Sequence, residues 1–121
     1  MWIAGSLHER NLERLVRWGD AWIPIMGAST DDIAEGARRI AEAWRAAGRD
    51  PIALGVQAPL RIEHGDDGRP DLARSIDSVP ELVAAGATDI HVTLRAFNRD
   101  PAEAPAVLAD IVRRFSDTVT R

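Results

Sequence analysis

The sequence has 121 residues, of which 45% are hydrophobic and 28% charged, with a formal net charge of −4, and it is expected to form one globular domain. The acidic balance argues against a nucleic-acid-binding protein, which would normally carry a basic stripe. All fifteen basic residues are arginine and there is no cysteine, which excludes Schiff-base lysines, disulfides, thiol nucleophiles and thiolate metal sites.

The first half of the sequence alternates short apolar strands with amphipathic helices. We predict a strand over 1–5, a helix over 7–18 and a second strand over 21–25. The clearest predicted helix follows: Ser29 or Thr30 can cap its start, and Gly48 ends it. Its apolar stripe consists of Ile33, Ala37, Ile40, Trp44 and Ala47.

The second half repeats this alternation around one irregular stretch. We predict a strand over 52–57, a loop over 58–71 and a strand over 89–95. Between the loop and the last strand we predict a helical segment over 71–85 that is broken near Ser78-Val79-Pro80 and stopped at Gly86. A last helix carries its apolar stripe on Ala104, Leu108, Ile111 and Phe115, after a segment at 100–103 that resembles a capping box.

Four successive strand–helix units favour an α/β fold with a parallel sheet. Two architectures fit: half of a TIM-type (β/α)8 barrel, with outer helices, or a small open doubly wound sheet. The third and fourth predicted strands each have one aliphatic face and one small or polar face. A doubly wound sheet would be apolar on both faces, so we predict a (β/α)4 half-barrel that forms a single domain over 1–121.

Four short motifs follow one another along the chain: "WIAG" (2–5), "GDAWIP" (19–24), "AGRDP" (47–51) and "PELVAAGATDIHVTL" (80–94). In this order and spacing they resemble the second half of the luciferase-like monooxygenase family. The sequence departs from the family pattern at Ala4 and Ala21, where the family has glycine. The resemblance implies an oxidoreductase that uses FMN or an F-420-type deazaflavin.

Members of that family are whole (β/α)8 barrels, whereas this sequence resembles only their last four units. We therefore expect an oxidoreductase half-barrel that is not catalytically complete alone and pairs as a homodimer or with a complementing N-terminal half-barrel. Two alternatives remain: a non-catalytic binding or assembly module on the same fold, and a doubly wound domain that binds a phosphorylated ligand. We expect no nucleic-acid partner.

Membrane and export signals are not visible in the sequence. No apolar run approaches the ~20 residues of a membrane span. The N-terminus also lacks the basic and apolar regions of a signal peptide. We therefore expect a cytoplasmic protein without a membrane partner.

The candidate cofactor-binding residues lie where predicted strands end and helices begin, because barrel ligands bind at the carboxyl ends of strands and helix N-termini favour phosphate. The alternative is that the two glycines only permit tight turns. These residues are Gly5, Ser6, Gly27, Ala28 and Ser29.

Arg95, at the end of the fourth predicted strand, is the remaining cofactor-binding candidate. Its guanidinium could hold a phosphate or carboxylate through two hydrogen bonds. The alternative is a surface ion pair with Asp89 or Asp100, which we favour.

For the other candidate groups we expect structural roles, and no catalytic residue is assigned. His91 is expected to form hydrogen bonds in the barrel interior rather than to act as an acid or base, and the segment around His64 is expected to be a solvated turn rather than a metal site. Burial is the expectation for Trp18, Trp22 and Trp44.

Overall fold

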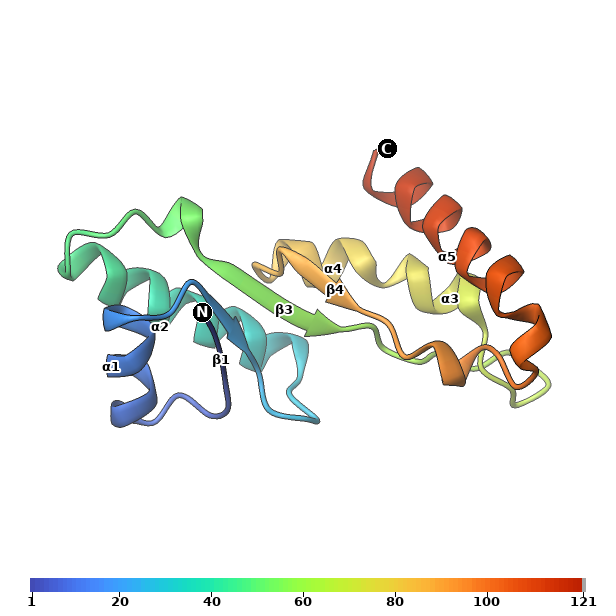
Figure 1. The fold of residues 1–121 in the computed structure, drawn as a ribbon, viewed down its shortest axis with the longest axis horizontal. Coiled ribbons are helices and arrows are strands. Elements are labelled where there is room, and N and C mark those ends of the chain that lie inside the picture. Colours follow the sequence, from blue (N-terminus) through green and yellow to red (C-terminus); the bar gives the residue numbers. More distant parts are fainter. Residues whose placement is uncertain (121) are drawn as a thin grey trace. The chain divides into compact units, whose positions relative to one another are not determined.

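The computed structural model, which describes residues 1–120, has an α/β fold with one four-stranded parallel sheet (Figure 1). The strands lie in the order β1-β2-β3-β4, which confirms the predicted half-barrel class. They are β1 (Trp2–Ala4), β2 (Ala21–Ile23), β3 (Gly55–Pro59) and β4 (Asp89–His91). The α-helices are α1 (Glu9–Arg17), α2 (Thr30–Ala46), α3 (Leu72–Asp77), α4 (Val79–Ala84) and α5 (Ala104–Val119).

The third strand begins three residues later than predicted. A 3-10 turn, Pro51–Ala53, precedes it, and the Asp50 carboxylate caps this turn by accepting from the Ile52 amide at 3.0 Å. Ile52 is consequently 89% exposed rather than on the aliphatic face of the strand. The prediction was wrong because apolar alternation continues through a turn that the Asp-Pro pair starts.

The fourth strand ends earlier than predicted. Pairing stops at His91, and a second 3-10 turn, Leu94–Ala96, follows. Arg95 therefore lies on this turn and not at the end of a strand. The alternation of apolar residues continues over the same segment, but it carries no information about where the backbone leaves the sheet.

The predicted break in the third helical segment is confirmed, because α3 and α4 are separate helices on either side of Ser78. The predicted capping segment at 100–103 caps a short 3-10 turn and not the last helix itself. The Asp100 carboxylate accepts from the Ala102 amide at 3.0 Å and caps a 3-10 turn, Pro101–Glu103. The regular helix α5 begins only at Ala104.

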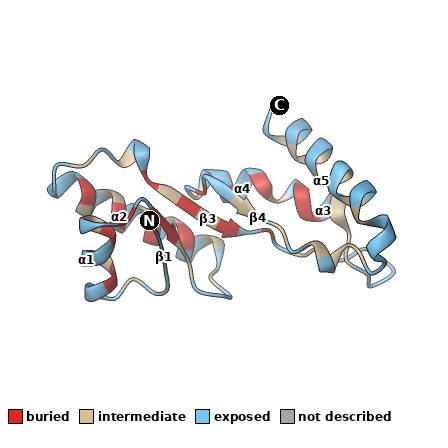
Figure 2. Ribbon diagram, viewed as in Figure 1, coloured by how far each residue is buried: buried red, intermediate tan, exposed pale blue. Residues whose placement is uncertain are grey.

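The chain divides into two compact units. The first unit comprises Met1–Ala58 and Leu82–Asp89, and the second comprises Pro59–Glu81 and the chain from Ile90 onward. The core of the first unit includes Leu15, Trp22, Ile33, Ile40, Trp44 and Val56 (Figure 2). The core of the second is built on Leu60, Ile76 and Val79, against which Leu72, Ile90, Val92, Phe97 and Phe115 pack.

The register of the sheet assigns its residues to two faces, one of which packs against α2. Ile3, Trp22 and Val56 form one row of paired residues. Trp22 and Val56 in this row are 4% and 1% exposed, and a Cβ on Gly36 of α2 would collide with the Trp22 ring. The neighbouring row consists of Trp2, Ala21 and Gly55, of which Trp2 is 48% exposed and Ala21 2%. In a barrel this second row faces the interior.

The motif "AGRDP" joins the end of α2 to the end of α1. Gly48 takes a positive φ of 78° just after the helix, a backbone conformation that favours glycine. The next residue, Arg49, donates to the carbonyl oxygens of Leu15 and Val16 at 3.0 and 2.9 Å. Its guanidinium carbon also lies 3.7 Å from the ring centroid of Trp44. The motif therefore stabilises the packing of two helices.

The expectation that three tryptophans are buried is confirmed for Trp22 and Trp44 but wrong for Trp18. Trp18 is 58% exposed, and the Arg17 guanidinium lies 5.4 Å from its ring centroid. The reason is its position: Trp18 caps the C-terminus of α1, beyond the helical turns that pack on the core.

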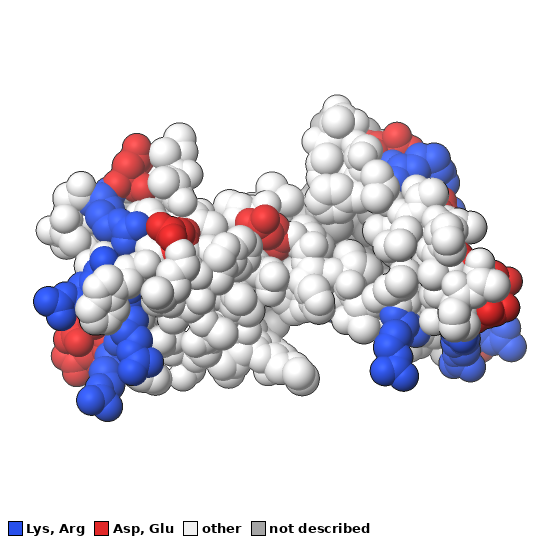
Figure 3. All heavy atoms as spheres, in the orientation of Figure 1, with Lys and Arg blue, Asp and Glu red and all other residues white. Residues whose placement is uncertain are grey.

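The charged side chains lie on the surface, and on the face that Figure 3 shows arginine and acidic side chains lie in mixed clusters, with uncharged surface elsewhere. Among residues 1–120, no helix combines the length and the apolar character that crossing a membrane requires.

Candidate functional site

The loop between β1 and α1 is held by four hydrogen bonds. Gly5 has a φ of 117°, and its amide donates to the Ile23 carbonyl at 3.0 Å. The Trp22 indole Nε1 donates to the Gly5 carbonyl at 2.9 Å. Asn11, 4% exposed, donates from Nδ2 to the carbonyls of Ala4 and Ser6 at 3.3 and 3.0 Å. Sequence reasoning missed Asn11, although its place four residues before the buried Leu15 put it on the core stripe of α1.

The loop between β2 and α2 is closed by its own hydrogen bonds. Gly27 has a φ of 85°, and the Ala28 amide donates to the Ile25 carbonyl at 3.1 Å. As predicted, Ser29 caps α2: its hydroxyl accepts from the Asp32 amide at 3.0 Å, and its own amide donates to Asp32 Oδ2 at 2.9 Å. An internal carboxylate thus uses donors that a phosphate would need.

The cap of α2 gives a first testable prediction. Ser29→Ala removes the hydroxyl that accepts from the Asp32 amide, so the free energy of unfolding should fall by about 1 kcal/mol in urea denaturation. A second hydrogen bond of the cap, from the Ser29 amide to Asp32 Oδ2, lowers the pKa of the Asp32 carboxyl below its ordinary 3.8. This carboxylate's contribution is therefore present above pH 3.8 and lost as the pH falls through the lower folded pKa. An unchanged free energy of unfolding at neutral pH would contradict the assignment of the cap.

A pocket of about 300 Å³ opens in the first unit between these two loops and α2. Of the predicted site residues, it brings together Ser6 and Ala28. The other predicted residues of these loops are chain neighbours of the lining, and Arg95 belongs to the second unit. The pocket is lined by Ser6, Leu7, Trp22, Pro24, Ile25, Ala28, Asp32, Glu35, Gly36 and Arg39.

The acidic groups of this pocket already have partners. Asp32 accepts from the Ser29 amide, and Glu35 pairs with Arg38 at 2.6 Å. The hydrogen bonds from Arg38 lower the pKa of the Glu35 carboxyl, so Glu35 remains ionised. By contrast, Arg39 makes no ion pair with any group among residues 1–120. Sequence reasoning missed Arg39, although the spacing along α2 separates it from Arg38, which has Glu35 and Glu42 one helical turn away on either side.

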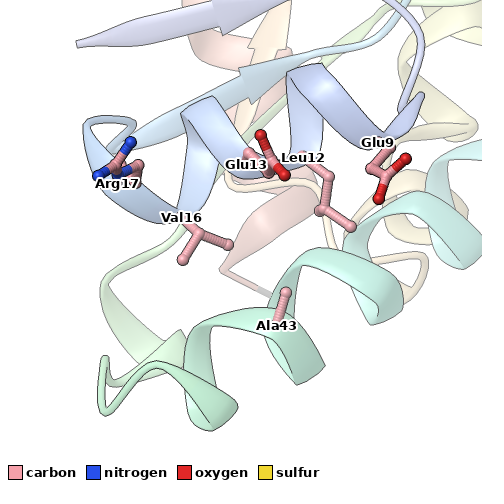
Figure 4. Close-up of a pocket in the computed structure, with 6 residues that line it drawn as sticks. All are labelled: Glu9, Leu12, Glu13, Val16, Arg17 and Ala43. Carbon is pink, nitrogen blue, oxygen red and sulfur yellow. The ribbon is translucent and has the colours of Figure 1, made fainter.

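A second, larger groove of about 500 Å³ runs between α1 and α2 (Figure 4). Leu12 and Val16 of α1 project toward Ala43 of α2 and form its apolar part. Glu9, Glu13 and Arg17 line it along α1. None of the predicted cofactor-binding residues lines this groove.

The remaining candidates lie apart from the pocket. Arg95 is exposed, and within residues 1–120 it pairs with neither Asp89 nor Asp100. His91 is exposed, and its carbonyl accepts from the Leu60 amide at 2.8 Å. The segment around His64 forms a turn in which Arg74 donates to the His64 carbonyl at 3.0 Å. The described part of the chain holds no cluster of three or more acidic or histidine side chains that could bind a metal ion.

Comparisons of this protein with protein-family models, with curated proteins and with solved structures found no match. The functional assignment therefore depends on the fold, on the chemistry of the pocket and on the motifs in the sequence.

Proposed function

We propose that this chain is the carboxyl-terminal half of a luciferase-like (β/α)8 oxidoreductase and is not catalytically complete by itself. The observation that carries the proposal is a pocket beside the carboxyl ends of two neighbouring strands in a sequentially ordered parallel sheet. Ser6 follows β1 and Pro24 follows β2, so the pocket lies at the edge where barrel enzymes bind their ligands. The sequential order also lacks the reversal at which doubly wound sheets bind ligands.

The cofactor of this proposal is FMN or an F-420-type deazaflavin, held here by its phosphate-bearing tail. When bound, such a group supplies hydride-transfer chemistry. The chain's own contribution is to hold and orient the tail. Ser6, Leu7 and Arg39 offer hydrogen-bond donors, and Trp22 with Pro24 and Ile25 offers an apolar wall. These groups would suit a ligand that joins an anion to an apolar body, against the negative charge of Asp32 and Glu35, which line the same pocket.

Completion of the barrel is the second part of the proposal. Within residues 1–120, β1 and β4 each pair with a strand on one side only, so the outer edge of each is free. Free strand edges are templates for association. On α5, the flank that faces α3 carries Arg113 and Arg114. The exposed apolar residues of α5 lie off this flank, at Leu108 (48% exposed), Val112 (63%) and Val119 (48%). In a closed barrel the next strand–helix unit packs beside the last helix, and we propose that a second copy provides it. A complementing N-terminal half-barrel would use the same surfaces.

A non-catalytic assembly module is the second candidate function. It is favoured by the absence of histidine from the pocket lining and by the two acidic side chains there that are already engaged. Such a module would share the free edges of the sheet and the exposed apolar residues of α5 but would bind no flavin.

Titration with FMN and with an F-420-type deazaflavin separates the two candidates. The proposed oxidoreductase half should shift the visible absorption band of at least one of these compounds and show saturable binding. A folded chain that binds neither compound would contradict the cofactor assignment and support the assembly module. Circular dichroism in the far ultraviolet on the same samples controls for folding.

A further inference from the structure

The groove between α1 and α2 leaves an apolar ridge partly exposed. Leu12 and Val16 lie four residues apart on α1, so they follow one another along the same side of the helix, and both are only half-buried. They project toward α2, whose contribution to the lining is the small side chain of Ala43 (Figure 4). The groove therefore has room for side chains from a second helix above this ridge.

The charged side chains of the groove are separated by sign along α1. Glu9 and Glu13 lie toward the start of the helix, and Arg17 lies in its last turn. Glu13 and Arg17 are one turn apart, yet among residues 1–120 none of these three side chains makes an ion pair. A surface that is acidic at one end and basic at the other is complementary to an antiparallel copy of itself.

The spacing of these residues defines the register of such a pair. A two-fold axis at the level of residue 14, midway between Leu12 and Val16, places Leu12 opposite the partner's Val16. The partner's Arg17 then comes level with residue 11, midway between Glu9 and Glu13 and about 3 Å along the helix axis from each. The two-fold repeats this contact in the opposite direction, so both guanidinium groups meet carboxylates.

We propose that the groove between α1 and α2 is an interface between two copies of this chain, whose α1 helices pack antiparallel on each other. The interface goes beyond the proposed function: it uses neither the edges of the sheet nor α5, and it does not depend on the flavin assignment. It combines a short apolar ridge with exposed ion pairs, so we expect it to form at higher protein concentration than barrel closure.

Sedimentation equilibrium from low micromolar to submillimolar protein tests this interface. The mean mass of the unmodified chain should rise with concentration, and added salt should reduce the rise. Arg17→Glu places a carboxylate opposite Glu9 and Glu13 and should weaken this association about tenfold or more. Arg14→Glu is the matched control, because it makes the same charge change in the same turn of α1 at a residue that does not line the groove. Equal effects of the two substitutions would overturn the proposal.

A charge swap tests the register itself. A chain with Glu9→Arg and Glu13→Arg should also fail to associate with itself, but it should associate with the Arg17→Glu chain, since every facing pair then has opposite charge. If the two folded variants do not associate when mixed, the proposed register is wrong. If the unmodified chain shows no rise in mass, the second copy is the wrong occupant of the groove. These substitutions leave the sheet edges unchanged, so the species present at low micromolar protein tests barrel closure separately.

Discussion

Trp44→Ala is expected to lower the free energy of unfolding by about 3–5 kcal/mol, a large part of the stability of a domain of this size. Trp44 is 1% exposed, and its Nε1 donates to the Leu15 carbonyl at 3.2 Å. The Arg49 guanidinium stacks on the same ring. Truncation therefore leaves a cavity between α1 and α2 and removes a cation–π contact as well as a hydrogen bond. Urea denaturation followed by far-ultraviolet circular dichroism, at one fixed protein concentration, measures the effect.

Trp18→Ala is the matched control for this substitution. Trp18 is 58% exposed and caps the end of α1, so its loss should cost less than about 1 kcal/mol. Similar losses in the two variants would show that the interface between α1 and α2 is not the core of the first unit.

Gly36→Ala is expected to destabilise the protein by about 1–3 kcal/mol through overpacking, although alanine is the better helix former. A Cβ at this position of α2 would lie 2.5 Å from Cζ3 of the Trp22 ring and 3.1 Å from Cδ1 of Leu7. Trp22 is 4% exposed and is held by its hydrogen bond to the Gly5 carbonyl, so its ring cannot move aside without breaking that bond. Thermal or urea unfolding measures the loss.

The sign of this effect should reverse when the large ring is absent. In a Trp22→Leu background the collision is removed, and Gly36→Ala should then stabilise by up to about 1 kcal/mol, the difference in helix propensity. If Gly36→Ala destabilises both backgrounds equally, the close approach of α2 to Trp22 is not the cause.

Much of the fold could be predicted from local patterns. The order of strands and helices, the cap at Ser29, and the helix stops at Gly48 and Gly86 follow from apolar period and turn chemistry, and the two glycines have φ values of 78° and 108°. The ends of β3 and β4 could not be predicted, because alternation continues through 3-10 turns at Pro51–Ala53 and Leu94–Ala96. Where a strand begins depends on pairing with its neighbour, which a single segment does not record.

The candidate site could be predicted only in part. The small residues at the ends of β1 and β2 lie in two loops next to the pocket, which Ser6 and Ala28 help to line. The pairing of Arg38 with Glu35 and Glu42 follows from helical spacing, but that Arg39 lines the pocket depends on tertiary packing, which this spacing does not record. Arg95 was placed on a strand because the apolar alternation continued past His91.

We propose that this chain is half of a flavin-type barrel and that a second copy completes it. Sedimentation equilibrium at low micromolar protein, read both in the protein band and in the visible band of added FMN or F-420-type deazaflavin, tests it most directly. We expect a species of twice the 13.2 kDa chain mass, with the cofactor absorbance sedimenting at that mass. A folded, cooperatively unfolding monomer that leaves both cofactors unbound would contradict it.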